Sequence, residues 1–225
     1  VILFVIGCMD YTIEDKATVV PEVDGDEILV EDTTIAQAKI YANTSGELYE
    51  FIPDQDEVIL IGSFFDDEGL VDHFEDIAID LNGHMYGGTG DYLYFINPLT
   101  AEVVEQCPLD MDTTALTFTS DGSLIIGTEN NLYILNLDDC STDALVTNSD
   151  YFTSGDIVGL PDGYLYWSVY GGDSDILVRV DPKTGTEKLI GPIGTNRLYG
   201  MGFANQQLYG FASDGSVFRI NDREA

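Results

Sequence analysis

The chain repeats one short pattern about every 40 residues, and this repeat restricts the folds that are open to it. Four segments carry the pattern: DIAIDLNGHMYGG, ALTFTSDGSLIIG, DIVGLPDGYLYWS and YGMGFANQQLYGF. The equivalent turn residues are Gly83, Gly122, Gly163 and Gln206, at spacings of 39, 41 and 43 residues. A period of about 40 to 45 residues is that of the blades of a β-propeller.

Each repeat contains the signals of short antiparallel strands. An apolar strand is followed by Asn-Gly or Asp-Gly, a pair that favours a type I′ hairpin, and then by an aromatic-rich strand. Third strands are expected at 92–96, 132–135, 176–180 and 217–220, and turns such as 181–185 lead into a fourth strand. No segment has sustained helical periodicity. The sequence therefore predicts an all-β fold, a β-propeller of four-stranded antiparallel blades.

About five units are visible, at 34–65, 74–107, 112–147, 153–192 and 196–225. The first unit shows strands at 38–42, 47–52 and 57–62 but no innermost strand, and the last unit stops after its third strand. We expect the missing pieces at the two ends to complement each other in the ring. Because a ring without its closing strand exposes unpaired edges, the sequence predicts an incomplete ring that is a fragment of a longer chain.

The repeats resemble those of bacterial secreted and lipoprotein β-propellers of the form "DIAxDxDGxLYG…LYxIDPxTG", related to NHL, YVTN and gluconolactonase-like propellers. The resemblance covers residues 34–225 and implies the architecture, although propellers host unrelated functions on one scaffold. Gluconolactonase-like propellers hold a divalent metal near the axis through Glu, Asn and Asp side chains. The resemblance implies that Asp76 and Asp156 could be ligands of such a metal, but the sequence around these two residues does not match that of the gluconolactonase-like propellers.

Acidic residues outnumber basic residues by 41 to 8, which gives a formal net charge of −33, and no Lys or Arg occurs between Lys39 and Arg179. Such a surface repels phosphate backbones and anionic lipid headgroups, so nucleic acid is excluded as a partner. Two explanations of the acidity stay open. The surface is either a solvated face adapted to salty surroundings or a face that binds cations.

The first ten residues, VILFVIGCMD, are too short to span a bilayer, which takes roughly 20 apolar residues. Within them, Val5-Ile6-Gly7-Cys8 resembles the lipobox of bacterial lipoprotein signal peptides, which implies that residues 1–8 end such a signal and that Cys8 is lipidated. Residues 9–33 carry nine acids and one Lys, so we expect an extended acidic tether. The alternative for residues 1–6 is a buried strand.

Two acids mark the first strands of their repeats. Seven residues before each turn position, the repeats have Asp76, Ala115, Asp156 and Tyr199. The innermost strands of a propeller surround its axis, so Asp76 and Asp156 are candidate ligands of a polar molecule or of a divalent cation such as Ca²⁺. The alternative is that both carboxylates accept hydrogen bonds from backbone N–H groups at a strand start.

The remaining cysteines and the histidines suggest structure rather than chemistry. Cys107 and Cys140 lie near the outer strands of consecutive blades, where an exported location permits a disulfide; two separate thiols are the alternative. His73 and His84 have no second His nearby and no Cys at ligand spacing, so no zinc site is expected. No G-x-S-x-G motif suggests a nucleophile.

These observations favour a non-catalytic binding or scaffolding module, lipid-anchored at the bacterial cell envelope. Its expected partner is a protein or a glycan, and its only contact with the membrane is the lipid anchor. The alternative is a divalent-metal-dependent hydrolase or lactonase of the gluconolactonase-like type that uses Asp76 and Asp156 around one ion.

Overall fold

The computed structural model describes residues 39–52, 55, 57–196 and 198–222, and its regular structure there is entirely β. Blade 1 consists of β1 (Ile40–Asn43), β2 (Glu47–Ile52) and β3 (Glu57–Ser63), and blade 2 of β4 (Asp76–Ile79), β5 (Met85–Gly88), β6 (Tyr92–Ile96) and β7 (Val103–Pro108). Blade 3 consists of β8 (Ala115–Phe118), β9 (Leu124–Thr128), β10 (Asn131–Leu135) and β11 (Thr142–Val146). Blade 4 consists of β12 (Thr153–Gly159), β13 (Leu165–Val169), β14 (Ile176–Val180) and β15 (Glu187–Pro192), and blade 5 of β16 (Leu198–Ala204), β17 (Gln207–Ala212) and β18 (Val217–Ile220).

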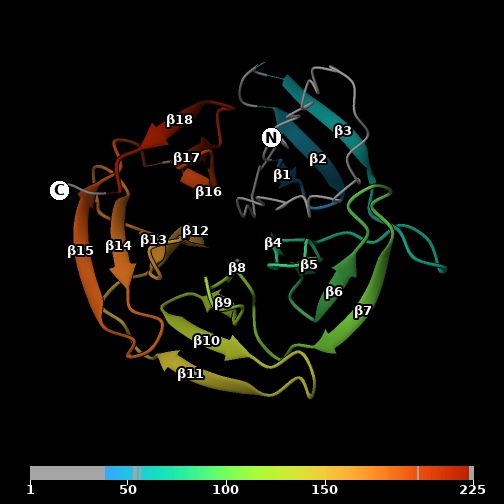
Figure 1. The fold of residues 1–225 in the computed structure, drawn as a ribbon, viewed down its shortest axis with the longest axis horizontal. Coiled ribbons are helices and arrows are strands. Elements are labelled where there is room, and N and C mark those ends of the chain that lie inside the picture. Colours follow the sequence, from blue (N-terminus) through green and yellow to red (C-terminus); the bar gives the residue numbers. More distant parts are fainter. Residues whose placement is uncertain (1–38, 53–54, 56, 197, 223–225) are drawn as a thin grey trace, which may run out of the picture.

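The five antiparallel sheets are arranged around one axis, which confirms the predicted all-β propeller (Figure 1). Strands β1, β4, β8, β12 and β16 surround the axis, while β7, β11 and β15 form the rim (Figure 1). A hydrophobic cluster fills each of the five interfaces between blades, with Trp167, for example, fully buried between blades 3 and 4. The part of the chain that the structure describes contains no helix long and apolar enough to cross a membrane.

The two terminal blades correct one prediction. Blade 1 does have its innermost strand: all four residues of β1 are buried, and β1 lies near β4 and β16, the inner strands of the neighbouring blades. Among the described residues, both blade 1 and blade 5 instead have no fourth, outer strand. Blade 1 therefore does not lack the inner strand that the expected complementation of the two ends required. Blade 1 packs directly on blade 5 through side chains, with the rings of Phe51 and Phe211 in edge contact at 5.6 Å between centroids.

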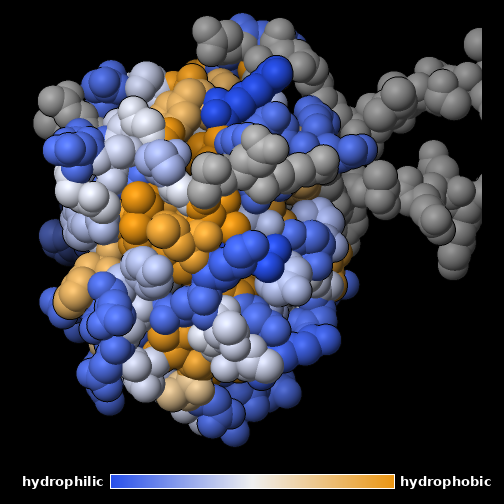
Figure 2. All heavy atoms as spheres, turned by 90° about the vertical axis from the view of Figure 1, so that its left-hand side faces the viewer, coloured by the Kyte–Doolittle hydropathy of each residue, from blue (hydrophilic) through white to orange (hydrophobic). Residues whose placement is uncertain are grey.

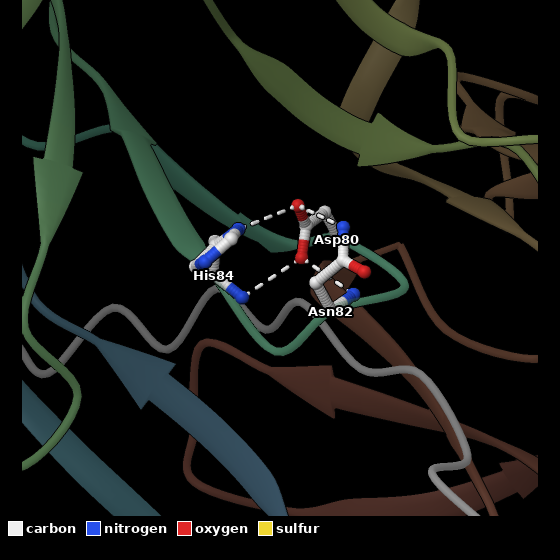
Figure 3. A network of polar contacts seen from close by, with 3 residues as sticks. All are labelled: Asp80, Asn82 and His84. Carbon is white, nitrogen blue, oxygen red and sulfur yellow. Dashed lines mark hydrogen bonds and ion pairs between the residues drawn. The ribbon is translucent and has the colours of Figure 1, made fainter.

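The hairpin turns also differ from the predicted type I′. In blades 2 to 4 the Gly residues have positive φ, 83° at Gly83 for example, whereas the preceding Asn or Asp does not. The Gly83 N–H donates to the carbonyl of Asp80, so the hairpin is a type I turn followed by a glycine in the left-handed region. The Asp80 carboxylate fixes this turn by accepting hydrogen bonds from the backbone N–H groups of Asn82 and His84, each at 2.8 Å (Figure 3).

The side chain of His84 belongs to this same turn. Its Nδ1 lies 3.0 Å from Oδ2 of Asp80, and about half of the side chain is exposed (Figure 3). Burial alone would raise the pKa of Asp80, but the hydrogen bonds from His84 and Asn82 together hold it below its usual value. His84 therefore stabilises a hairpin.

A disulfide joins blades 2 and 3 at the rim. Cys107 is the last residue but one of β7, Cys140 lies in the loop before β11, and their Cα atoms are 5.5 Å apart. Of the two alternatives that the sequence left open, the structure contains the covalent bridge. Cys8 and the acidic segment 9–33 lie outside the described residues.

Candidate binding site at the propeller axis

The two acids singled out in the sequence meet at the axis of the ring. Asp76 begins β4 of blade 2, and Asp156 lies in β12 of blade 4; both side chains are fully buried. The two carboxyl groups are hydrogen-bonded to each other. The carboxylate of Asp76 also accepts hydrogen bonds from the N–H groups of Ile77 and Leu116, both at 2.6 Å.

Asp156 repeats this arrangement in the next pair of blades. Its carboxylate accepts hydrogen bonds from the backbone N–H of Ile157 in its own strand and from that of Met201 in β16. Each acid thus joins its own blade to the following one, blade 2 to blade 3 and blade 4 to blade 5. These hydrogen bonds agree with the second interpretation of the sequence, in which both carboxylates accept hydrogen bonds from backbone N–H groups.

Burial dominates the protonation of this pair. Desolvation, followed by the charge of Asp156 and the hydrogen bond with it, raises the pKa of Asp76 well above its usual range. Desolvation likewise raises the pKa of Asp156 to about 8, although its hydrogen bonds to Met201, Asp76 and Ile157 oppose the shift. Two carboxylates at hydrogen-bonding distance without a positive partner retain a proton between them, so the pair is partly protonated at neutral pH.

This environment does not resemble a cation site. All four oxygens of Asp76 and Asp156 already accept backbone N–H groups, and a cation would have to displace these bonds. Within the described ranges, no group of three or more His, Cys, Asp or Glu residues has the geometry to hold a metal ion. Hard divalent cations need several oxygen ligands, and the pair alone offers none that is uncommitted.

An open pocket lies at the axis where the inner strands begin. Seven residues line it: Glu75, Thr114, Thr153, Ser154, Gly155, Tyr170 and Tyr199. Its volume is about 160 Å³. Four of the blades contribute to it, because Glu75 precedes β4, Thr114 precedes β8, Gly155 lies in β12 and Tyr199 lies in β16.

The sequence pointed to the layer of side chains below this pocket and missed the pocket itself. Counting back from the turn aligns Tyr199 with Asp76 and Ala115, but the turn of blade 5 has one residue fewer than that of blade 3, so the count is off by one position. The hydrogen bonds of the two acids show the correct alignment. Asp76 accepts from the N–H of Leu116, and Asp156 accepts from the N–H of Met201, so Leu116 and Met201 are equivalent. The residues before them, Ala115 and Gly200, are therefore equivalent too. Tyr199 is therefore equivalent to Glu75 and Thr114, in the layer that lines the pocket.

The pocket combines exposed aromatic rings with polar side chains. Tyr170 is 66% exposed and Tyr199 is 38% exposed. The Oγ1 of Thr153 is buried and has no hydrogen-bond partner among the described residues. Desolvation raises the pKa of the Glu75 carboxyl, an effect that His73 opposes and Asp112 reinforces. Exposed aromatic rings beside a few polar side chains in one open pocket are a feature of ligand-binding sites.

Two other hollows are larger. One, of about 530 Å³, is lined mainly by acids, among them Asp66, Glu102 and Glu105. The other, of about 540 Å³, lies between blades 4 and 5, with Ile190 and Phe203 in its lining beside Arg179, whose guanidinium lies 4.2 Å from the ring centroid of Tyr164. Figure 2 shows apolar side chains gathered on this side of the molecule, within a mostly hydrophilic surface.

Comparison with known proteins shows the fold and nothing finer. No family model matches the sequence, and no curated protein matches it. The structure resembles a chain in the crystal structure of a nidogen/laminin complex, at 13% identity and a TM-score of 0.58, over 83% of this chain and 72% of that one. It also resembles the extracellular domain of a hybrid two-component system from B. thetaiotaomicron, at 14% identity and a TM-score of 0.51, over 83% of this chain but only 26% of that one.

Proposed function

We propose that the chain is a binding module of an exported, envelope-anchored protein and that it holds one group of its ligand in the axial pocket without transforming it. The pocket carries this proposal, because it is open and is lined by two tyrosines, a carboxylate and three hydroxyl-bearing residues. The partner is a protein or a glycan that presents this group.

Three observations support an exported location. The Cys107–Cys140 disulfide is of a kind that persists in oxidising compartments and is rare in the cytosol. One protein of similar fold is an extracellular domain from a bacterium. Finally, Val5-Ile6-Gly7-Cys8 resembles a lipobox, which would anchor the mature protein through Cys8.

The hydrolase alternative finds less support in the site. A general base at the axis would need a carboxylate that can reach a substrate, and both Asp76 and Asp156 are fully buried with every oxygen hydrogen-bonded. Among the residues that the structure describes, the lining of the pocket above them includes one carboxylate, that of Glu75. We therefore do not propose lactone or ester hydrolysis.

The proposal is tested with a panel of small saccharides, amines, carboxylic acids and short peptides. We expect at least one class to raise the thermal unfolding midpoint of the wild-type chain and to lose this effect in Tyr199→Leu, a change at a partly exposed residue. Chromatography of the incubated ligand should show no product. Turnover of a lactone that disappears in Asp156→Asn would contradict the proposal, as would a panel in which no compound binds.

A further inference from the structure

We infer that the axial pocket binds a protonated primary amine carried on an alkyl stem. This inference rests on the proposed function and names the chemistry of the group that the pocket receives. It is carried by the two tyrosine side chains and the carboxylate that line one small space.

The aromatic rings favour a cation. Tyr170 and Tyr199 lie on different blades, at the end of β13 and in β16, and both line the pocket with exposed side chains. A ring face attracts an ammonium group through its quadrupole, and two rings at one site form part of an aromatic cage. The alkyl stem of the amine would bury apolar surface against the same rings.

The polar groups favour a primary amine over a quaternary one. The Glu75 carboxylate lines the pocket and, when charged, can only accept hydrogen bonds. A primary ammonium group has three N–H bonds to donate to it, whereas a quaternary ammonium group has none. None of the described residues that line the pocket is basic.

Charge and size agree with this assignment. The formal net charge of −33 attracts cations to the molecule and repels anions. A volume of about 160 Å³ corresponds to the space of roughly five water molecules, which suits one aminoalkyl group rather than a long chain. A lysine side chain or a free alkylamine would fit equally well.

The test is a titration of the full chain with n-pentylammonium, followed by calorimetry and by the NMR signals of the tyrosine rings. Three further probes separate the contributions: tetramethylammonium keeps the charge without the N–H donors, n-pentanol keeps the stem without the charge, and glucose represents a neutral saccharide. We expect n-pentylammonium to bind at least about tenfold more tightly than any of the three.

Substitutions locate the binding. Glu75→Gln and Tyr199→Leu should each weaken binding of n-pentylammonium by about tenfold, and Tyr170→Leu by a smaller factor because that ring is more exposed. The matched control is Glu102→Gln, which removes one negative charge at another hollow and should change the affinity by less than about twofold. Unchanged far-UV circular dichroism shows that each variant folds.

The outcomes separate this inference from the proposed function. Equal weakening by Glu75→Gln and Glu102→Gln would show diffuse attraction to an acidic surface and overturn the ammonium site. Equal or tighter binding of n-pentanol, tetramethylammonium or glucose, lost in Tyr199→Leu, would also overturn it but leave a ligand-binding module. Absence of any ligand that depends on Tyr199 would overturn both.

Discussion

A fully buried carboxyl group without a positive partner must find hydrogen-bond donors or keep a proton, and Asp76 and Asp156 do both. Each carboxylate accepts two backbone N–H groups from two neighbouring blades, and the two share a hydrogen bond with each other. Removal of one partner of such a network leaves buried donors unsatisfied, at a cost of about 1–3 kcal/mol for each group. The acids therefore connect blades 2, 3, 4 and 5 at the axis.

The raised pKa of the pair predicts how stability depends on pH. The unfolded chain releases these protons near pH 4, whereas the folded chain holds at least one of them up to about pH 8 at Asp156. The folded state thus binds more protons between these values. The free energy of unfolding contributed by the pair should be fully present below pH 4 and fall as pH rises towards 8, by at most about 1.4 kcal/mol per pH unit for one proton.

Urea unfolding at pH 5 and pH 8, at constant ionic strength, measures this dependence. Asp156→Asn should be less stable than the wild type at pH 5, because the amide cannot accept from both Ile157 and Met201, but it should lose less stability between the two values. The exposed acid variant Glu102→Gln should keep the wild-type slope. A wild-type slope that persists in Asp156→Asn would contradict the shared proton.

At the scale of the strand and its turn, local sequence predicted most of what the structure contains. Alternating apolar residues and the glycines of the hairpins placed the strands, because both signals act over a few residues. The predicted type I′ turn was wrong, because a glycine at positive φ, as at Gly83, occurs both in that turn and in a type I turn followed by a glycine bulge. The sequence pair Asn-Gly therefore does not distinguish the two. The two-residue hairpin with both residues at positive φ occurs instead at Asn205 and Gln206, where glycine is absent.

The binding pocket was beyond the reach of this local pattern. Its lining depends on which residue of each inner strand reaches the mouth of the axis, and the turn of blade 5, one residue shorter than that of blade 3, shifts Tyr199 by one position. A repeat alignment with a turn of constant length cannot detect that shift. Tyr170 joins the pocket from the end of a second strand, β13, so no position within the inner strands could have indicated it.

The disulfide makes a prediction at the same scale, because it ties one blade to the next. Cys107 and Cys140 are separated by 33 residues, and closing a loop of this length in the unfolded chain corresponds to about 3–4 kcal/mol of stability. The double variant Cys107→Ser/Cys140→Ser should have a free energy of unfolding that is lower by this amount, and its midpoint of urea unfolding should fall accordingly. Cys8→Ser, which keeps the bridge, is the control, and an equal midpoint for both variants would contradict a stabilising role.

At the scale of the molecule, the interface between blades 1 and 5 differs from the other four. Its hydrophobic cluster contains six buried residues among the described residues, whereas each of the other clusters contains ten. A small hollow of about 40 Å³ lies beside Phe51 and Phe211. The sequence could predict five repeats from their period, but the quality of closure depends on contacts between residues at opposite ends of the chain.

This difference predicts that the ring opens first between blades 1 and 5. Phe211 is 4% exposed and packs against Phe51, so Phe211→Ala should weaken this interface by about 3–5 kcal/mol. Hydrogen exchange should then accelerate in β1, β2, β16 and β17, while β8, β9 and β10 keep the protection of the wild type, because local opening exposes only the blades that separate.

Phe118→Ala provides the matched comparison, since Phe118 is equally buried but lies between blades 2 and 3, against Tyr86. In the Phe118→Ala variant, amide hydrogen exchange should increase around β5, β6, β8 and β9 rather than in β1 and β2. If Phe211→Ala instead accelerates exchange evenly in all five blades, the ring unfolds as one cooperative unit and the interface between blades 1 and 5 is not its weakest point. If the acceleration stays local, the closure of this propeller depends on side-chain packing between its first and last blades.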